Sequence, residues 1–452
     1  MKKLMLICAP VGTRSGYGAH CRDLVWSFID GGEYEVKILD VPWGQTPRNA
    51  LDKNNKNDKK ILDCLLTQPQ TDRQPDVYVD IRIPNEFQTY GKVNIGITAG
   101  IETNAVSSNW IDSCNKMDLV IVPSEHSKSG FVSAVYDKLQ QLPNGEQQKV
   151  GELRLEKPME VIFEGSDEDI YKPIENTSLD LVDDIPEDFA FLTLGQWGKG
   201  NFGEDRKDIA TTIKCFYESF ANKKEQPCLV LKTSGASTSI LDREDCLHKI
   251  RTVKNMFPKD WKLPNVYLLH GDLTDDGINK LYNHPKIKCM LSLTHGEGYG
   301  RPLQEATMVG LPVIASGWSG QMDFLSETHS LLVGGKLQEV PKSAHWKDII
   351  IPQSQWFYVD EQQASKMMNY VFENCEEMSS KALELMKINR DKFTLKKMSE
   401  KLNNIVREYT KDIPQQVGLQ LPKLKKVDKK DSPSSIQLPK LKKTNQNEGA
   451  SV

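Results

Sequence analysis

The residues best suited to chemistry lie in one segment, SLTHGEGYGRPLQEATMVGLPVIASGWSGQMDFL, at Ser292–Leu325. An apolar run ends in the glycine-bracketed turn HGEGYG, and a helix pattern then begins near Arg301-Pro302. Proline close to the first position of a helix removes no needed hydrogen-bond donor. Glycines allow a ligand to approach the backbone closely, and a helix N-terminus favours negative charge. The turn therefore predicts a cradle of main-chain N–H groups for a diphosphate.

Two glutamates with seven residues between them accompany this turn. Glu297 lies in the turn itself, where its carboxylate can meet a sugar. Glu305 lies about one turn into the following helix and could accept hydrogen bonds from the two hydroxyls of a ribose. A glycine-rich turn alone would be weak evidence, but the glutamates, glycines and proline in this order predict a nucleotide-sugar site.

A second glycine-rich turn, APVGTRSGYGAHCRDL, follows the first apolar run. Gly12, Gly16 and Gly18 are its expected close-approach positions. Taken alone, SGYG could equally be the cofactor turn of an NAD enzyme. The full G-x-G-x-x-G is absent, because Cys21 occupies the third position, and Asp40 is the acidic residue near the end of the second apolar run. An NAD-dependent oxidoreductase thus remains an alternative with weak support.

Three further polar features are candidates for a role in the site. Glu102 follows the run KVNIGITAG, at the edge where α/β sheets bind ligands, so it is expected to orient an acceptor or act catalytically. The alternative is an acidic residue stabilised near a helix N-terminus. His295, beside the turn, is interpreted as structural rather than as a base. The DED of Asp167–Asp169 resembles a metal-binding D-x-D, but its place near a linker favours a turn, and no metal site is predicted.

The elements that must position these residues are short apolar runs, most of them followed by an amphipathic stretch. Such runs are typical of strands buried on both faces of a parallel sheet. Two successive series predict two doubly wound α/β domains. The expected strands are Leu4–Ala9, Tyr34–Val41, Asp76–Asp80, Val93–Ala99, Leu119–Pro123 and Glu160–Glu164, then Phe189–Gly195, Cys228–Thr233, Val266–His270, Cys289–Thr294, Val313–Ser316 and Ser330–Val333.

The domain boundaries follow from these series and from changes in composition. The Asp- and Pro-rich stretch Ile174–Asp188 is the expected linker, and helical patterns follow at Glu361–Glu377 and Ser380–Tyr409. The polar segment Asn49–Gln74 is expected to be a mobile loop or, alternatively, an acceptor-side loop. The expected parts are residues 1–175, an acceptor-side domain; 186–378, a nucleotide-sugar-binding domain; 379–410, a helix packing back on the first domain; and 411–452, a disordered tail.

The composition indicates a cytoplasmic protein without a membrane span. Hydrophobic residues make up 38% of the chain and charged residues 27%. The mean hydropathy is −0.50, and no apolar run approaches the roughly 20 residues that cross a bilayer. The opening MKKLMLICAP is expected to form a strand rather than a signal peptide. Nine scattered cysteines with no C-x-x-C pair are typical of reduced thiols in the cytosol and lack zinc-site spacing.

The tail contains QLPKLKK twice, at Gln420–Lys426 and Gln437–Lys443. From Pro414 onward, eight lysines against three acidic residues give a charge of +5, leaving −9 for the residues before it. Such a segment cannot bury enough apolar surface to offset its ordering entropy, so disorder is expected. The charge asymmetry and the repeat suggest an anionic surface, DNA or a clamp-like partner; the alternative is a solvated lysine-rich tail.

The stretch from Glu297 to Glu305 resembles the E-x7-E motif of the family 4 glycosyltransferases and continues into that family's G-L-P-V-I-A-S strand. The resemblance extends over about residues 1 to 405. It implies the GT-B fold, in which two Rossmann-like domains face each other across a cleft. It also implies transfer of a sugar from a nucleotide diphosphate with retention at the anomeric carbon and without a metal.

Other segments extend the resemblance. LTLGQWGKGNFGEDRKDI places Lys207 at the family's phosphate-neutralising lysine, but Gln196 where the family has arginine. Arg206 is the residue that could compensate. VIFEGSDEDIYKP and VPSEHSKSGF are similar to the family's linker-proximal segment and to its P-S-x-x-S-K element.

These observations and the resemblance together imply a site without a metal or cofactor. Preorganised amides and cations would stabilise the charge that develops on the leaving diphosphate. The expected catalytic residues are Glu297, Lys207 and Glu102. The expected donor-binding residues are Gly16, Gly18, Arg206, Lys207, Glu297, Gly298, Tyr299, Gly300, Arg301 and Glu305.

The acceptor stays open between a lipid or cell-surface glycan, a protein and a modified DNA base. A non-catalytic protein of the same fold that binds nucleotide sugars or nucleic acid is the main alternative to an enzyme.

Overall fold

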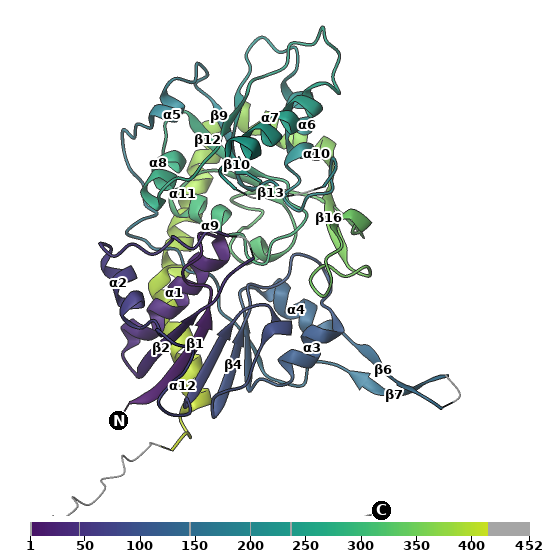
Figure 1. The fold of residues 1–452 in the computed structure, drawn as a ribbon. Coiled ribbons are helices and arrows are strands. Elements are labelled where there is room, and N and C mark those ends of the chain that lie inside the picture. Colours follow the sequence, from purple (N-terminus) through teal and green to yellow (C-terminus); the bar gives the residue numbers. More distant parts are fainter. Residues whose placement is uncertain (1, 45, 144–145, 199, 236, 415–452) are drawn as a thin grey trace, which may run out of the picture. The chain divides into compact units, whose positions relative to one another are not determined.

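A computed structural model describes residues 2–44, 46–143, 146–198, 200–235 and 237–414. Both copies of QLPKLKK, and with them the predictions about residues 415–452, lie outside the described residues. Within the described part, every expected strand forms, and together they build two six-stranded parallel sheets (Figure 1). The predicted pair of doubly wound α/β domains is therefore confirmed.

The first sheet is the core of the first domain, and its strand order is β2-β1-β3-β4-β5-β8. Leu, Ile and Val side chains of these strands are buried on both faces, which is why the sequence shows continuous apolar runs. The order reverses between β1 and β3. The strands are β1 Lys3–Ala9, β2 Tyr34–Asp40, β3 Val77–Ile81, β4 Val93–Ile97, β5 Leu119–Val122 and β8 Met159–Val161.

The second sheet, in the second domain, has the order β11-β10-β9-β12-β13-β14, which reverses between β9 and β12. Ligands of open α/β sheets bind beyond the carboxyl ends of the strands at such reversals. The segments after β1, β9 and β12 are therefore the places to look for a site. The strands are β9 Ala190–Gln196, β10 Cys228–Ser234, β11 Val266–Leu269, β12 Ile287–Ser292, β13 Val313–Ser316 and β14 Leu331–Val333.

Helices cover both sheets. In the first domain they are α1 Gly16–Gly31, α2 Lys56–Asp63, α3 Ser108–Cys114 and α4 Glu125–Ser133, with the 3-10 turn η1 Pro84–Glu86. Those that follow are α5 Asp180–Asp183, α6 Ile209–Phe220, α7 Ile240–Lys254, α8 Asp275–Tyr282, α9 Arg301–Met308, α10 Glu361–Glu373, α11 Cys375–Lys392 and α12 Leu395–Thr410, with the 3-10 turns η2 Gly320–Asp323 and η3 Lys342–Ala344.

The C-terminal helical region divides into two helices where the sequence pattern predicted one long helix. The break falls at Thr394, whose backbone pairs with Ser166 and whose side chain caps α12 by accepting a hydrogen bond from the Lys397 N–H. Before the break, α11 packs on α9 of the second domain. After it, α12 packs on α1 of the first (Figure 1). Side chains of α12 are fully buried in the first core: Met398, Leu402 and Val406.

Two antiparallel hairpins were not predicted from the sequence. They consist of β6 Tyr136–Gln141 with β7 Gln147–Leu153, and of β15 Gly335–Glu339 with β16 Gln355–Val359. Residues of β6, β7 and β15 are largely exposed, so they lack the apolar run that marks a buried strand.

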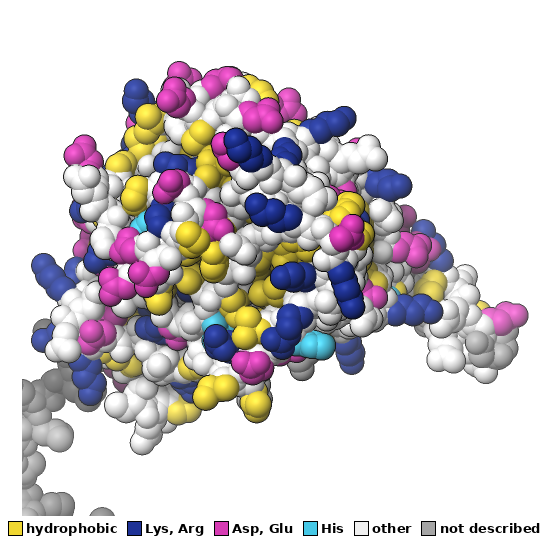
Figure 2. Space-filling model, turned by 90° about the horizontal axis from the view of Figure 1, so that it is seen from above, with side chains coloured by type: hydrophobic (Ala, Val, Ile, Leu, Met, Phe, Trp, Pro, Cys, Tyr) yellow, Lys and Arg dark blue, Asp and Glu magenta, His cyan; other side chains and the backbone are white. Residues whose placement is uncertain are grey.

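The surface and the cysteines bear on the compositional predictions. All nine cysteines are free thiols. No helix among the described residues is long and apolar enough to cross a membrane. On the face shown in Figure 2, lysine and arginine side chains are interspersed with acidic and apolar ones, so no single sign of charge covers it.

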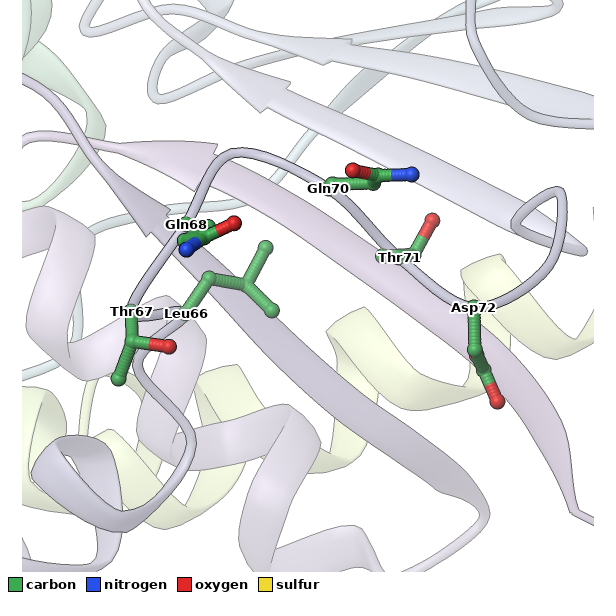
Figure 3. Close-up of a pocket in the computed structure, with 6 residues that line it drawn as sticks. All are labelled: Leu66, Thr67, Gln68, Gln70, Thr71 and Asp72. Atoms are coloured by element: carbon green, nitrogen blue, oxygen red, sulfur yellow. The ribbon is translucent and has the colours of Figure 1, made fainter.

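The polar segment 49–74 is more structured than a mobile loop. It contains α2, and Leu65 pairs with Ile38 of β2. A hollow of about 330 Å³ follows, lined by residues 66–68 and 70–72 (Figure 3). Arg73 then contacts Glu35 and the Lys2 carbonyl at the amino ends of β2 and β1. This second half of the segment thus runs away from the carboxyl edge, where an acceptor-side loop was expected.

Candidate active site

Four charged side chains meet where the carboxyl edges of the two sheets lie together, and we call them the Glu297 cluster. The Glu297 carboxylate lies 2.5 Å from Lys207 Nζ and 2.8 Å from Arg206 Nη1. Arg206 Nε lies 2.8 Å from Glu102 Oε1. Glu102 follows β4 of the first domain, whereas the other three follow β9 and β12 of the second. The cluster therefore joins both domains at the predicted site.

Burial and pairing set the charge states of the Glu297 cluster. Burial alone raises the pKa of Glu297, but the Arg206 and Lys207 charges outweigh it and hold that pKa at about 2. Burial also raises the pKa of Glu102 despite the opposing Arg206 charge. Burial acts against the charge on Arg206, yet Glu102 and Glu297 raise its pKa above the ordinary value. Glu297 and Arg206 are thus strongly held in their charged forms.

The segment that carries Arg206 and Lys207 is fixed by the end of β12. The Arg206 carbonyl accepts hydrogen bonds from the His295 N–H at 2.8 Å and from Thr294 Oγ1 at 3.0 Å. The His295 ring is wholly buried, with its nitrogens 2.9 Å from the Phe357 carbonyl and 3.1 Å from the Gly203 carbonyl. His295 therefore braces the backbone, in line with the structural interpretation.

The turn after β12 presents main-chain donors. The Glu297 N–H donates to Ser319 Oγ at 2.9 Å. The next three amides, of Gly298, Tyr299 and Gly300, have no hydrogen-bond acceptor among the described residues. Gly300 has a φ of 101°, which favours glycine, and it caps the N-terminus of α9. Buried amides are normally paired, so this turn suits an anionic ligand.

The glycines differ in what surrounds them. A Cβ on Gly298 would lie 2.1 Å from the Ala99 carbonyl oxygen, so the second domain's turn touches the first domain's backbone here. A Cβ on Gly18 would lie 2.3 Å from the Thr13 carbonyl oxygen, whereas nothing lies near one on Gly16. Gly18 is thus required by packing, and Gly16 faces open space at the start of α1.

A second set of charges, which we call the Arg301 cluster, surrounds the first turn of α9. Arg301 Nη1 lies 2.6 Å from Asp23 of α1 and 3.8 Å from Glu164, which follows β8. Arg301 Nε lies 3.4 Å from Glu305 Oε1, and the Tyr282 hydroxyl lies 3.2 Å from Glu305 Oε2. Three carboxylates thus share one guanidinium in a buried setting.

The Arg301 cluster has the opposite electrostatic character to the Glu297 cluster. Burial raises the pKa of Glu305 to about 7, and it raises the pKa of Glu164 to about 7 as well, although Arg301 opposes both shifts. Nearby, burial and the Arg301 charge lower the pKa of His20 to about 3, so this ring is neutral. Near neutral pH, Glu164 and Glu305 are therefore partly protonated, whereas Glu297 is ionised.

The structure brings most of the predicted site residues together, but in two groups. Glu102, Arg206, Lys207 and Glu297 form one, and Arg301 with Glu305 belongs to the other. The Gln196 side chain instead donates to the Gly235 carbonyl, so the guanidinium beside Glu297 is that of Arg206.

Sequence reasoning missed Asp23, Glu164 and Tyr282 as neighbours of the site, whereas the family resemblance places Trp318-Ser319-Gly320 in the donor pocket. Ser319 has a φ of 75°, a conformation that usually requires glycine. Only Asp23 carried a signal, since it follows the glycine-rich turn on the same helix.

Two other predicted features are accounted for by internal contacts. The Gly12 N–H and Arg48 both bond Asp40, so the carboxylate considered for an NAD ribose is engaged within the protein. Asp167 accepts a hydrogen bond from the Asp169 N–H within the turn expected at this triplet.

One group of described residues could hold a cation by distance alone, Cys215 with Glu218 and Glu361. The Lys214 ammonium already pairs with both of those carboxylates. These residues therefore fit an ion pair better than a metal ion.

Two parallel sheets with these strand orders, each presenting its carboxyl edge to a shared group of charges, define the GT-B fold, the architecture of many nucleotide-sugar glycosyltransferases. Among solved structures, the chain is similar to HepE of Anabaena in complex with UDP-glucose, with a TM-score of 0.58 and 15% identity, covering 89% of this chain and 99% of HepE.

Two further solved structures show the same likeness. Sucrose-phosphate synthase of Thermosynechococcus elongatus has a TM-score of 0.60 and 12% identity, covering 90% of this chain and 99% of that protein. A glycosyltransferase of Rickettsia africae has a TM-score of 0.58 and 13% identity, covering 91% and 99% respectively. No protein-family profile and no curated protein sequence matches the chain. At these identities, the likeness establishes the fold.

Proposed function

We propose that this chain is a retaining, metal-independent glycosyltransferase that uses a nucleotide-diphosphate sugar. The observation that carries the proposal is Glu297, held by Arg206 and Lys207 beside three main-chain amides that have no acceptor among the described residues. Cations and free amides directed at one place are what a diphosphate requires. The E-x7-E resemblance and the GT-B fold both support this proposal.

The donor is placed as follows. The donor's diphosphate replaces Glu297 as the ion-pair partner of Arg206 and Lys207. It also accepts hydrogen bonds from the amides of the turn and lies at the N-terminus of α9. Glu297 is then released to accept hydrogen bonds from the sugar hydroxyls. Glu305, whose Oε2 lies beside Tyr282, accepts the ribose hydroxyls.

Breaking the bond between sugar and phosphate builds negative charge on the diphosphate. Preorganised cations and amides stabilise that charge in a water-poor site without reorganising, which is the largest contribution in many enzymes. Glu102 comes from the first domain and meets the same cluster through Arg206, so we assign it the orientation of the acceptor nucleophile. Retention at the anomeric carbon belongs to the proposal through the family resemblance.

The sugar and the surroundings of the enzyme are further parts of the proposal. UDP-glucose is the first donor to test, because HepE has been solved with it. Nine free thiols suit a reducing compartment, which supports a cytoplasmic location. The acceptor is a glycan or lipid, a protein or a modified DNA base.

The test is a thermal-shift screen of UDP-glucose, ADP-glucose and GDP-mannose, followed by turnover with the best of them in the presence of EDTA. A ligand that binds only the folded state raises its melting temperature. Release of the nucleoside diphosphate in EDTA, with an α-linked product from an α-linked donor, is the expected result. Binding without any donor cleavage or transfer would instead indicate a non-catalytic nucleotide-sugar binding protein.

A further inference from the structure

We infer that Ser124, in the first domain, is a positioning residue for the diphosphate cradle of the second. It fixes the peptide unit between Gly298 and Tyr299 so that the Tyr299 N–H is directed at the donor. This inference rests on the proposed function and assigns a residue outside the E-x7-E motif to the same site.

The contact is short and fully buried. Ser124 Oγ donates to the Gly298 carbonyl oxygen at 2.6 Å, and Ser127 Oγ lies 3.4 Å from the same oxygen. Neither serine is exposed to solvent. Ser124 follows β5 and begins α4, where its Oγ also accepts a hydrogen bond from the Ser127 N–H as the helix N-cap. The first domain thus donates a hydrogen bond to a backbone carbonyl of the turn that carries Glu297.

Because the peptide unit is planar, fixing its carbonyl also fixes the direction of its N–H on the opposite side. A trans peptide unit is planar, and its N–H points in the direction opposite to its C=O. The Gly298–Tyr299 bond is trans, like every other described peptide bond. Anchoring the Gly298 carbonyl on Ser124 therefore directs the Tyr299 N–H away from α4. That N–H is one of the amides with no acceptor among the described residues.

The backbone on either side leaves this peptide unit little freedom to rotate. A Cβ on Gly320 would lie 2.3 Å from the Gly298 carbonyl oxygen, and one on Gly298 would lie 2.1 Å from the Ala99 carbonyl oxygen. Asp323 of η2 accepts a hydrogen bond from the Glu125 N–H at 2.9 Å, which ties the first turn of α4 to the Gly320 segment. Ser124 makes the shorter of the two side-chain hydrogen bonds to the carbonyl itself, at 2.6 Å against 3.4 Å for Ser127.

The consequence concerns rate more than affinity. The Lys207 and Arg206 charges attract a bound diphosphate whether or not one amide is aligned, but charge that develops during cleavage benefits from donors already in place. An interaction realised mainly in the transition state lowers kcat with little change in KM when it is lost. Ser124 should therefore affect kcat through the orientation of the Tyr299 N–H.

The experiment compares three variants of the full chain, using the nucleotide sugar from the thermal-shift panel that wild-type protein cleaves. Ser124→Ala removes the hydroxyl that donates to Gly298 and also removes the helix cap. Ser124→Thr retains both. Ser107→Ala is the matched control, because Ser107 caps α3 of the same domain by accepting from the Trp110 N–H.

We expect Ser124→Ala to lower kcat at least about tenfold with KM within about twofold, a smaller loss than outright deletion of a transition-state donor. Ser124→Thr should retain most of the wild-type kcat. Ser107→Ala should have the wild-type kcat although its melting temperature falls about as much as that of Ser124→Ala. Hydrogen exchange should quicken in a peptide spanning residues 296–301 only for Ser124→Ala.

The outcomes separate the two proposals. The positioning role alone is overturned if Ser124→Ala turns over as fast as wild type. It is also overturned if Ser107→Ala lowers turnover as much as Ser124→Ala does. Wild-type protein that neither binds nor cleaves any sugar nucleotide overturns the proposed function and the positioning role with it, whatever the hydrogen exchange shows.

Discussion

The Glu297 cluster and the Arg301 cluster lie at opposite ends of the same short segment, the turn after β12 and the first turns of α9, yet their charge balance is reversed. Around Glu297, two cations face two carboxylates, and the pKa of Glu297 is held at about 2. Around Arg301, one cation faces three carboxylates, and burial raises the pKa of both Glu164 and Glu305 to about 7.

The reversed balance indicates which part of a ligand each end can take. An anion can displace Glu297 from Arg206 and Lys207 and leave no cation unpaired. An anion placed near Glu305 would meet further buried negative charge, whereas a hydroxyl group would supply the donor that a carboxylate accepts. Electrostatics thus divides one segment into a diphosphate end and a ribose end, and the following experiments probe that division.

The largest effect is expected from removing a cation of the Glu297 cluster. Lys207→Ala should lower kcat by about 10²–10³, because the leaving diphosphate loses a preorganised charge. Lys207→Arg should retain part of the activity, since the charge stays but its geometry changes. Steady-state release of nucleoside diphosphate measures this.

Lys214→Ala is the matched control for Lys207→Ala, since Lys214 is also paired with two carboxylates, Glu218 of α6 and Glu361 of α10, which belong to neither cluster. Equal losses in the two variants would contradict the diphosphate assignment. Complete loss of wild-type turnover in EDTA would contradict the metal-free mechanism.

The pH dependence of stability should have opposite signs in the two clusters. Burial raises the pKa of Glu164 to about 7, so between its unfolded value near 4.5 and pH 7 the folded protein binds more protons than the unfolded chain. This group's contribution to the free energy of unfolding therefore falls as pH rises through that window. For Glu297, with a pKa of about 2, the contribution is present above pH 4.5 and is lost as pH falls toward 2.

Glu164→Gln tests the sign. Relative to wild type, the free energy of unfolding of the variant should rise by on the order of 2–3 kcal/mol between pH 4.5 and pH 8, because the cost of ionising a buried carboxyl disappears. Urea unfolding at pH 5 and pH 8 measures it. Glu168→Gln, at an exposed position four residues along the chain, should leave the pH profile unchanged. A steeper fall in stability with pH in Glu164→Gln would refute the charge reversal.

A smaller effect is expected on nucleotide affinity at the ribose end. Glu305→Ala should weaken binding of UDP at least several-fold, since a buried hydroxyl without its partner costs on the order of 1–3 kcal/mol. Glu305→Gln retains one acceptor oxygen and should lie between Glu305→Ala and wild type. Calorimetry measures this. Unchanged affinity in a folded Glu305→Ala variant would remove Glu305 from the ribose role.

The smallest effect on chemistry is expected from deleting Leu419–Val452, which contains both lysine-rich repeats. Turnover on a small soluble acceptor should stay within about twofold, while the rate on a macromolecular acceptor falls and becomes less salt-dependent, because two tethered copies of a motif raise the effective concentration. Initial rates at low and high salt measure this. If the deletion also abolished donor hydrolysis, the division between chemistry and tethering would be wrong.

The fold was largely predictable from the sequence because buried parallel strands leave a local mark. The run Leu4–Ala9 of β1 is apolar throughout, as is Ala190–Leu192 of β9, and both strands lie at their predicted places. The hairpin of β6 and β7 leaves no such mark, since both of its strands are mostly exposed. The break between α11 and α12 depends on Ser166, more than two hundred residues away in sequence, and no local pattern predicts it.

The same distinction holds within the site. Arg301 and Glu305 are four residues apart on one helix, so their proximity follows from helix geometry. Asp23 meets Arg301 from 278 residues away, and Ser124 meets Gly298 from 174 residues away. Motif spacing identifies the residues that face a ligand, but the contacts that orient them are set by how the two domains pack together.

The return of the chain to the first domain has a consequence for its synthesis. Met398, Leu402 and Val406 of α12 are fully buried in the core built around β1. On a ribosome, that core must stay open on one side while the whole second domain is made, and it closes only after α12 has emerged. The glycine-rich turn before α1 is translated ahead of the second domain, but it acquires its final support only after the second domain has been made.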